Sequence, residues 1–197
     1  LKYIYELENG KKHRLTLSDK IYMEWIKALI DFYFHNRKAE AVSVLEAVIP
    51  LLSISDLNYI KVLNTLLNFY YDTGDLTRFS EVQEHLESGL SRLNLNIVEE
   101  LELFIKFHYN VCRYLWLQNH IEEAITKISA TIEQCKKYRT IYLLADLYVL
   151  MGNVSKNFSS NITVKEYFDT ARFLYKLEEN MSMALKVEHY IAEMREQ

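Results

Sequence analysis

The 197-residue sequence predicts an all-α fold, and three observations carry that prediction. Half of the residues are apolar, with only four glycines and one proline, so turns are few and helices long. The apolar residues recur at helical spacing. Polar breaks recur at intervals of 38, 45 and 33 residues. Such intervals indicate stacked helix pairs, so we expect a TPR- or HEAT-like right-handed superhelix with a concave groove.

The four breaks share a pattern of large and small residues that supports this repeat. The breaks fall at Asn36, Gly74, Asn119 and Gly152. A large residue lies four positions before each break, namely Phe32, Tyr70, Leu115 and Tyr148. An alanine follows in the second helix of three units, namely Ala41, Ala124 and Ala171, whereas Phe79 takes that place in the second unit. These positions resemble those where TPR helices interlock.

Start and stop signals predict the helices of the first half. Ser18 begins a helix over 18–35, and the polar break HNRK separates it from a helix over 38–52. Ser55 begins a helix over 56–72. Gly74 can take the left-handed conformation that closes this helix, and Asp75 can cap the next one, over 76–92.

The second half is predicted to contain five helices, over 97–118, 120–137, 139–154, 164–177 and 180–195. Asn119 with Glu122, and Thr163 with Glu166, have the spacing of a capping box. The polar stretch NFSSN is the longest loop. The apolar positions of the last helix can cap the stack or seal a homodimer, and the candidates for dimerisation are Met181, Leu185, Tyr190 and Met194.

The chain begins with Leu1 and not with methionine, so we interpret residues 1–17 as a linker from a missing N-terminal segment and 18–197 as the repeat domain. No apolar run has the roughly 18 residues of a membrane span. Two cysteines within helical patterns suggest no disulfide framework and fit a reducing, cytoplasmic location.

Several function classes are disfavoured by the residues. A net charge of −4 argues against nucleic-acid binding by this segment, because such binding needs a basic surface. No HExxH motif, glycine-rich phosphate loop or GxSxG elbow is present, so we predict no enzyme and no cofactor. His108 and Cys112 are four residues apart, but without a third ligand they do not predict a metal site.

The first helix of each pair should line the groove, and its inward positions mix cations, amides and aromatics, which suit an extended peptide. The predicted peptide contacts are Lys61, Asn64, Asn68, Tyr71, Tyr109, Arg113, Arg139 and Tyr142, with Asp146 in the same register. Asn64 and Asn68 are four apart and should lie on one helix face.

The segments WIKALIDFYFHNRKAEAVSVLEAVIPLL, LNTLLNFYYDTGDLTRF, LYVLMGN and YFDTARFLYKLEENMSMALKVEHYI carry a resemblance to a known family. The chain resembles the C-terminal repeat domain of the Rgg/GadR/MutR regulators of Gram-positive bacteria. The resemblance implies a DNA-binding helix-turn-helix before Leu1, a short hydrophobic pheromone peptide in the groove and a homodimer formed by the last helices. The alternative is a TPR-like scaffold that binds a protein partner and has no DNA-linked role.

Overall fold

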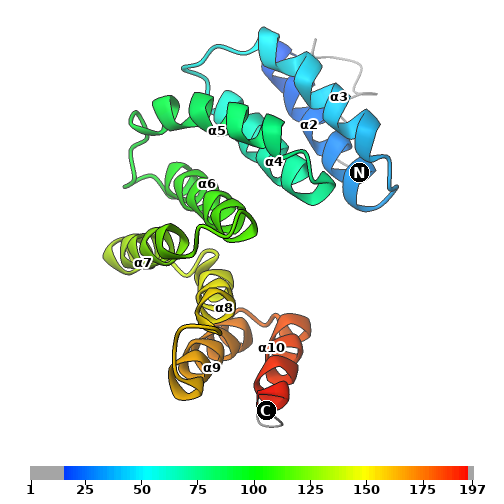
Figure 1. Cartoon of the computed structure of the whole chain (residues 1–197). Coiled ribbons are helices and arrows are strands. Elements are labelled where there is room, and N and C mark those ends of the chain that lie inside the picture. Colours follow the sequence, from blue (N-terminus) through cyan, green and yellow to red (C-terminus); the bar gives the residue numbers. More distant parts are fainter. Residues whose placement is uncertain (1–15, 195–197) are drawn as a thin grey trace. The chain divides into compact units, whose positions relative to one another are not determined.

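A computed structural model describes residues 16–194, and this part of the chain is helical throughout, with short connections and no strand (Figure 1). The all-α prediction is therefore confirmed. The helices are α2 (Leu17–Tyr33), α3 (Lys38–Val48), the 3-10 turn η1 (Ile49–Leu51), α4 (Leu57–Thr73), α5 (Leu76–Leu90), α6 (Val98–Leu117), α7 (Ile121–Tyr138), α8 (Leu144–Ser155), α9 (Asn161–Leu177) and α10 (Met181–Glu193).

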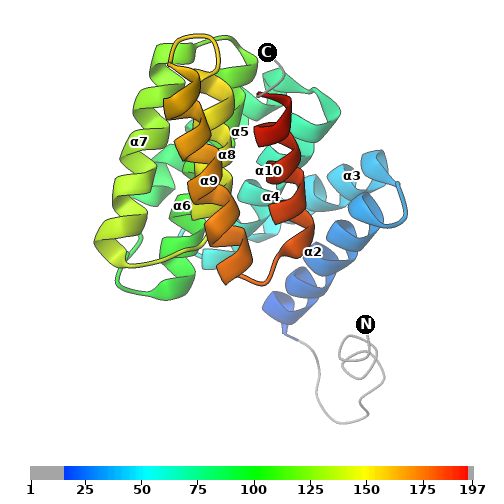
Figure 2. The ribbon, with the colours of Figure 1, turned by 90° about the horizontal axis from the view of Figure 1, so that it is seen from below.

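The chain divides into two compact units between Arg92 and Leu93. The first unit contains α2–α5 and the second α6–α10 (Figure 2). In each unit, consecutive helices pack as antiparallel pairs: α2 with α3, α4 with α5, α6 with α7, and α8 with α9, while α10 packs on α9. The predicted linker falls almost wholly outside the described residues.

Aromatic stacking and several side-chain hydrogen bonds join the two pairs of the first unit. The rings of Phe32 on α2 and Phe69 on α4 stack with centroids 3.8 Å apart. The indole Nε1 of Trp25 donates to Thr65 Oγ1 over 2.8 Å. Ala41 and Phe79 are completely buried in the second helices of the two pairs. Phe79 is thus buried at the position where the other units have an alanine.

The second unit has a tightly packed interior in which the predicted interlocking alanines, Ala124 and Ala171, are completely buried. Both cysteines are free and buried as well. Burial raises the pKa of Cys112 to about 12 and that of Cys135 to about 11. At neutral pH both thiols are protonated, so they serve as small apolar residues.

The position of Gly152 shows that the predicted repeat register of the second unit is wrong at this point. The sequence pattern placed a break there, but Gly152 lies inside α8 and is buried. A Cβ at this position would lie 2.7 Å from a ring carbon of Phe168 on α9. The glycine is therefore a point of close helix packing, and the real break between α8 and α9 comes later, at residues 156–160.

Two of the predicted caps are confirmed and the others are displaced. Gly74 has φ 78° and closes α4, and the Asp75 side chain accepts from the Arg78 amide at the start of α5. The actual N-caps of the other predicted starts are Thr16, Asp56, His120 and Ser160, in place of Ser18, Ser55, Asn119 and Thr163. Each displacement is one to three residues. Thr16, Asp56 and Ser160 accept cap hydrogen bonds in competition with neighbouring polar residues, whereas His120 makes no side-chain cap hydrogen bond.

Candidate functional site

A group of polar and aromatic side chains gathers in the second unit around the carboxylate of Asp146. We call it the Asp146 cluster, and its members are Tyr109 and Arg113 on α6, Tyr142 before α8, Asp146 on α8, Tyr175 on α9 and Glu178 at the end of α9. The Tyr175 hydroxyl donates to Asp146 Oδ1 over 2.8 Å. The Arg113 guanidinium carbon lies 5.6 Å from the centroid of the Tyr109 ring.

Local backbone features position the members of this cluster. Tyr109 and Arg113 are one turn apart on α6, so they share a helix face. Between α7 and α8 the chain turns sharply, with Arg139 and Leu143 both in the left-handed region. The Tyr142 amide in this turn donates to Thr140 Oγ1 over 3.2 Å. Asp146 then falls in the first turn of α8, where the unsatisfied N–H groups favour a carboxylate.

The electrostatics of the cluster are set mainly by burial. Burial raises the pKa of Asp146, while the hydrogen bond from Tyr175 and the nearby charge of Arg113 lower it. The pKa of Tyr175 is raised by burial and by the Asp146 charge. Burial and Asp146 also raise the pKa of Glu178. Arg113 is thus the cation that partly compensates a half-buried acidic centre.

Chemically, this arrangement is suited to binding. Arg113, Tyr109, Tyr142 and Asp146 are all half-buried, so each keeps some surface for a ligand. Together they offer a guanidinium, phenol hydroxyls and a carboxylate beside aromatic rings. Main-chain amides and carbonyls of an extended peptide need such donors and acceptors, and the rings offer apolar contact.

The predicted peptide contacts of the first unit lie along α4, with very different exposure. Lys61, Asn68 and Tyr71 are half-buried, whereas Asn64 has no exposed surface. The Asn68 amide donates to the hydroxyl of Tyr33 on α2. A ligand could touch Asn64 only if its surroundings opened, so the two asparagines do not form an exposed ladder in this structure. Their contact with a peptide stays a prediction.

In the second unit, the structure brings Tyr109, Arg113 and Tyr142 together but places Arg139 elsewhere. Arg139 is the exposed C-cap of α7 with φ 55°, and it does not lie on the face of a helix as the predicted register assumed. The assumed helix began at residue 139, but α8 begins at Leu144. The contact of Arg139 with a peptide therefore stays a prediction, but the helix register from which it was inferred is not the observed one.

Of the four predicted dimerisation residues, two are strongly exposed. Met181 is 54 % exposed and Leu185 is 61 % exposed, and both lie on α10. Tyr190 and Met194 are half-buried. The Tyr190 ring lies 5.8 Å from that of Phe168, so it is partly engaged within its own unit. Two apolar side chains near the end of α9, Phe173 and Leu177, are also strongly exposed.

Sequence reasoning missed Tyr175, because it assigned the groove to the first helix of each pair and Tyr175 lies on a second helix. One signal was available. Tyr175 follows the interlocking Ala171 by four residues, which places both on the inward face of α9. Asp146 was placed on the inward face by the same spacing that identified Tyr142.

Within residues 16–194, no three His, Cys, Asp or Glu side chains gather so as to hold a metal ion. In the same part of the chain, no helix combines the length and apolar character needed to cross a bilayer.

Neither a protein-family model nor a curated protein sequence matches this chain, but solved structures do. Apo PlcR of Bacillus thuringiensis superposes with a TM-score of 0.78 at 18% identity, covering 96% of this chain and 71% of PlcR. PlcR in complex with the peptide PapR7 and DNA superposes with a TM-score of 0.77 at 18% identity, covering 94% of this chain and 67% of PlcR. A Rap protein complexed with Competence and Sporulation Factor gives 0.75 at 14% identity, covering 98% of this chain but 52% of Rap.

At these identities the likeness shows the fold alone. Helix pairs that follow one another as they do in PlcR and Rap make this chain a TPR-like helical repeat protein.

Proposed function

We propose that this chain is the regulatory domain of a peptide-sensing transcription regulator of the Rgg/GadR/MutR kind. In this proposal the domain binds a short hydrophobic peptide, forms a homodimer and acts in the cytoplasm, while DNA is bound by a helix-turn-helix outside this sequence. The observation that carries the proposal is the likeness, over nearly the whole chain, to PlcR solved with a peptide and DNA and to a Rap protein solved with a signalling factor.

The Asp146 cluster supports peptide binding on physical grounds. It collects a guanidinium, a carboxylate and several phenols at the surface of the second unit, and burial strengthens each hydrogen bond made there. We propose Arg113, Tyr109 and Tyr142 as the contacts of this unit, and Lys61, Asn68 and Tyr71 as those of the first unit. Asn64 remains in the proposed set as a buried residue that a peptide would reach only after local opening, and Arg139 remains as an exposed residue outside the helix that the predicted register assumed.

In this mechanism the peptide acts by stabilising one conformation of the dimer over another. A ligand shifts such an equilibrium only by its difference in affinity for the two states. The coupling is reciprocal, so DNA binding would alter the affinity for peptide by the same factor.

Calorimetric titration with a panel of short synthetic hydrophobic peptides tests the proposal. We expect at least one peptide to bind, with an affinity reduced about tenfold or more in Arg113→Gln, since a hydrogen bond to a charged group contributes about 1.5–3 kcal/mol. Arg172→Gln is the matched control, because Arg172 lies on α9 and pairs with Asp169. Equal binding by wild type and Arg113→Gln would remove the cluster from the site.

The link to DNA has its own test. The gene segment that precedes the codon for Leu1 should encode a helix-turn-helix. If it encodes none, the plain interaction scaffold replaces the regulator.

A further inference from the structure

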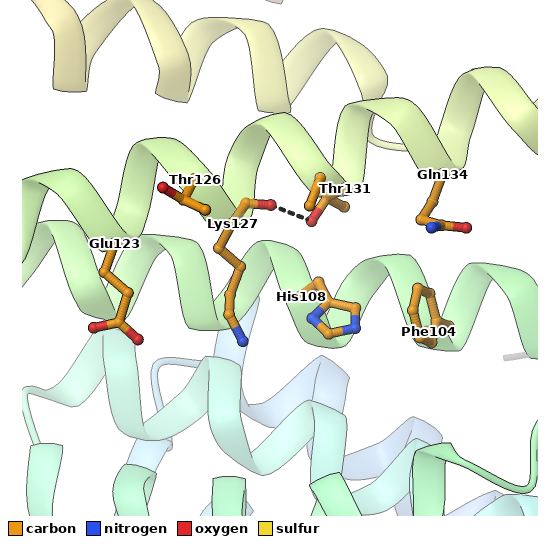
Figure 3. Close-up of a pocket in the computed structure, with 8 residues that line it drawn as sticks. Phe104, His108, Glu123, Thr126, Lys127, Thr131 and Gln134 are labelled. Carbon is orange, nitrogen blue, oxygen red and sulfur yellow. Dashed lines mark hydrogen bonds between the residues drawn. The ribbon is translucent and has the colours of Figure 1, made fainter.

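A pocket on the α6–α7 pair lies on a different side of α6 from the Asp146 cluster. It has a volume of about 350 Å³ and is lined by Phe104, His108, Glu123, Thr126, Lys127, Ala130, Thr131 and Gln134. Figure 3 shows Phe104 and His108 side by side on α6, with Lys127 extending from α7 on the side of His108. The volume is at the lower end of the range for small-molecule sites, so it suits a small ligand.

The position on α6 separates this pocket from the proposed peptide contacts. Phe104 and His108 are one turn apart and share a face, and their rings meet edge to face with centroids 4.3 Å apart. At 3.6 residues per turn, Tyr109 and Arg113 lie about 100° to 140° around the helix from His108. A ligand in the pocket would therefore leave the Asp146 cluster open.

The pocket has apolar walls and a single cationic group. Phe104, His108, Thr126, Ala130 and Thr131 contribute to the walls, and the lining surface is mostly apolar. Burial and the charge of Lys127 lower the pKa of His108 to about 4, so its ring is neutral at pH 7. Within residues 16–194, no carboxylate forms an ion pair with Lys127, which is itself half-buried.

The other ionised group of the pocket, Glu123, is at its rim. Its side chain is 62% exposed, and its Oε2 atom lies 4.0 Å from Nδ1 of His120. Water and salt screen a charge in this position, whereas Lys127 is a half-buried residue of the pocket lining. The pocket therefore combines an apolar interior with a positive charge that, among the described residues, has no counter-ion from the protein.

We propose that the α6–α7 pocket binds a small amphipathic carboxylate, with its apolar body between Phe104 and Ala130 and its carboxylate on Lys127. Charge complementarity selects this class, because the ammonium of the half-buried Lys127 is stabilised by an anion that accepts its hydrogen bonds. A neutral ligand would leave that charge uncompensated, and an amine would be repelled by it.

Octanoate serves as the probe, with octylamine as the probe of opposite charge. Binding is followed by NMR through the His108 ring protons and the methyl groups of Ala130 and Thr131. We expect octanoate to shift these signals in a saturable way and octylamine to leave them unchanged. Failure of octanoate to bind, or equal binding of octylamine, would overturn the proposal.

Four variants locate the binding and its charge. Lys127→Met keeps the apolar stem and should weaken octanoate binding about tenfold or more, whereas Lys137→Met, an exposed position on the same helix, should not. Ala130→Trp should abolish binding by filling the pocket, and it should still fold because Ala130 is exposed. Glu123→Gln should tighten binding by removing a repelling charge. Unchanged affinity in Lys127→Met or Ala130→Trp would sink the assignment, as would weaker binding in Glu123→Gln.

The Arg113→Gln variant separates this site from the proposed peptide site. It should bind octanoate as wild type does, even where its affinity for peptide is reduced. Loss of octanoate binding in Arg113→Gln would place the carboxylate in the Asp146 cluster and contradict the pocket.

Discussion

Two neighbours favour the charged form of the half-buried Asp146 carboxylate. Tyr175 donates a hydrogen bond to it and Arg113 supplies a nearby positive charge, while burial favours the protonated form. Removing the Tyr175 hydroxyl by Tyr175→Phe leaves the carboxylate without this donor. We expect the free energy of unfolding at pH 7 to fall by about 1–3 kcal/mol, measured by urea denaturation.

Tyr167→Phe is the control for this prediction. Tyr167 is half-buried on the same helix, and its ring lies 6.4 Å from that of Tyr148. Its substitution should change the unfolding free energy by no more than about 0.5 kcal/mol. Equal losses in the two variants would show that the hydroxyl of Tyr175 contributes nothing specific.

The sign of the pH dependence follows from the direction of the Asp146 shift. Its pKa is raised above 3.8 in the folded protein. Between the unfolded and the folded pKa, the folded state binds more protons, so the contribution of Asp146 to stability decreases as pH rises. Tyr175→Phe should raise this pKa further, because the lost hydrogen bond lowers it. An NMR titration of the Asp146 carboxyl carbon measures the change, and a lower pKa in the variant would contradict the role of Tyr175.

At the scale of elements, α8 and α9 approach closely because Gly152 has no side chain. A methyl group there would meet the Phe168 ring, which is completely buried and has little room to move. We expect Gly152→Ala to lower the free energy of unfolding by about 1–3 kcal/mol from overpacking, despite the gain in helix propensity. Chemical denaturation measures the loss.

Gly89→Ala is the matched control, since Gly89 also lies in a helix and a methyl group added there would meet nothing within 4 Å. It should be neutral or stabilising by up to about 1 kcal/mol. If Gly152→Ala behaves in the same way, close packing does not explain the glycine.

Two residues, Ser160 and Thr163, are candidate N-caps for α9. Ser160 accepts from the Thr163 amide over 3.2 Å, whereas the sequence pattern favoured Thr163 with Glu166. Ser160→Ala should therefore cost about 0.5–2 kcal/mol of unfolding free energy, and Glu166→Ala should cost little. Thermal or urea unfolding of the two variants decides between the caps, and a larger loss in Glu166→Ala would favour the sequence-based assignment.

These elements show what periodicity can and cannot predict. Helix type and order follow from the apolar spacing, and Ala41, Ala124 and Ala171 are buried as that spacing requires. The predicted break at Gly152 was wrong because a single sequence does not distinguish a glycine that ends a helix from a glycine that lets two helices approach closely. The difference lies in Phe168, which is distant in sequence and adjacent only in the fold.

On the scale of the whole molecule, the same limit applies to the candidate site. Spacing placed Tyr109, Arg113 and Asp146 on the first helices of their pairs, and the structure brings them into one cluster. It could not find Tyr175, whose hydroxyl reaches Asp146 from the next helix, nor the burial of Asn64. Both depend on how deeply each side chain is covered by its neighbours, and residue spacing alone does not specify that depth.

The proposed homodimer would cover an apolar surface at the C-terminal end of the chain. Phe173 and Leu177 on α9 and Met181 and Leu185 on α10 are each more than half exposed. A stable dimer interface buries about 1,200–2,000 Å² and has an apolar centre. We expect the wild-type domain to dimerise and Leu185→Asp to be a monomer, because the new carboxylate would be buried without a partner.

Sedimentation velocity over a range of concentrations measures this change. Since Leu185 is 61% exposed, its substitution should leave the fold of the monomer intact, which circular dichroism can check. Lys186→Glu is the control: it changes the charge of α10 by more than Leu185→Asp does, at an exposed position about 100° around the helix. If Lys186→Glu dissociates the dimer as strongly, net charge explains the effect. A wild-type domain that stays monomeric would instead leave the apolar surface of α9 and α10 to another partner.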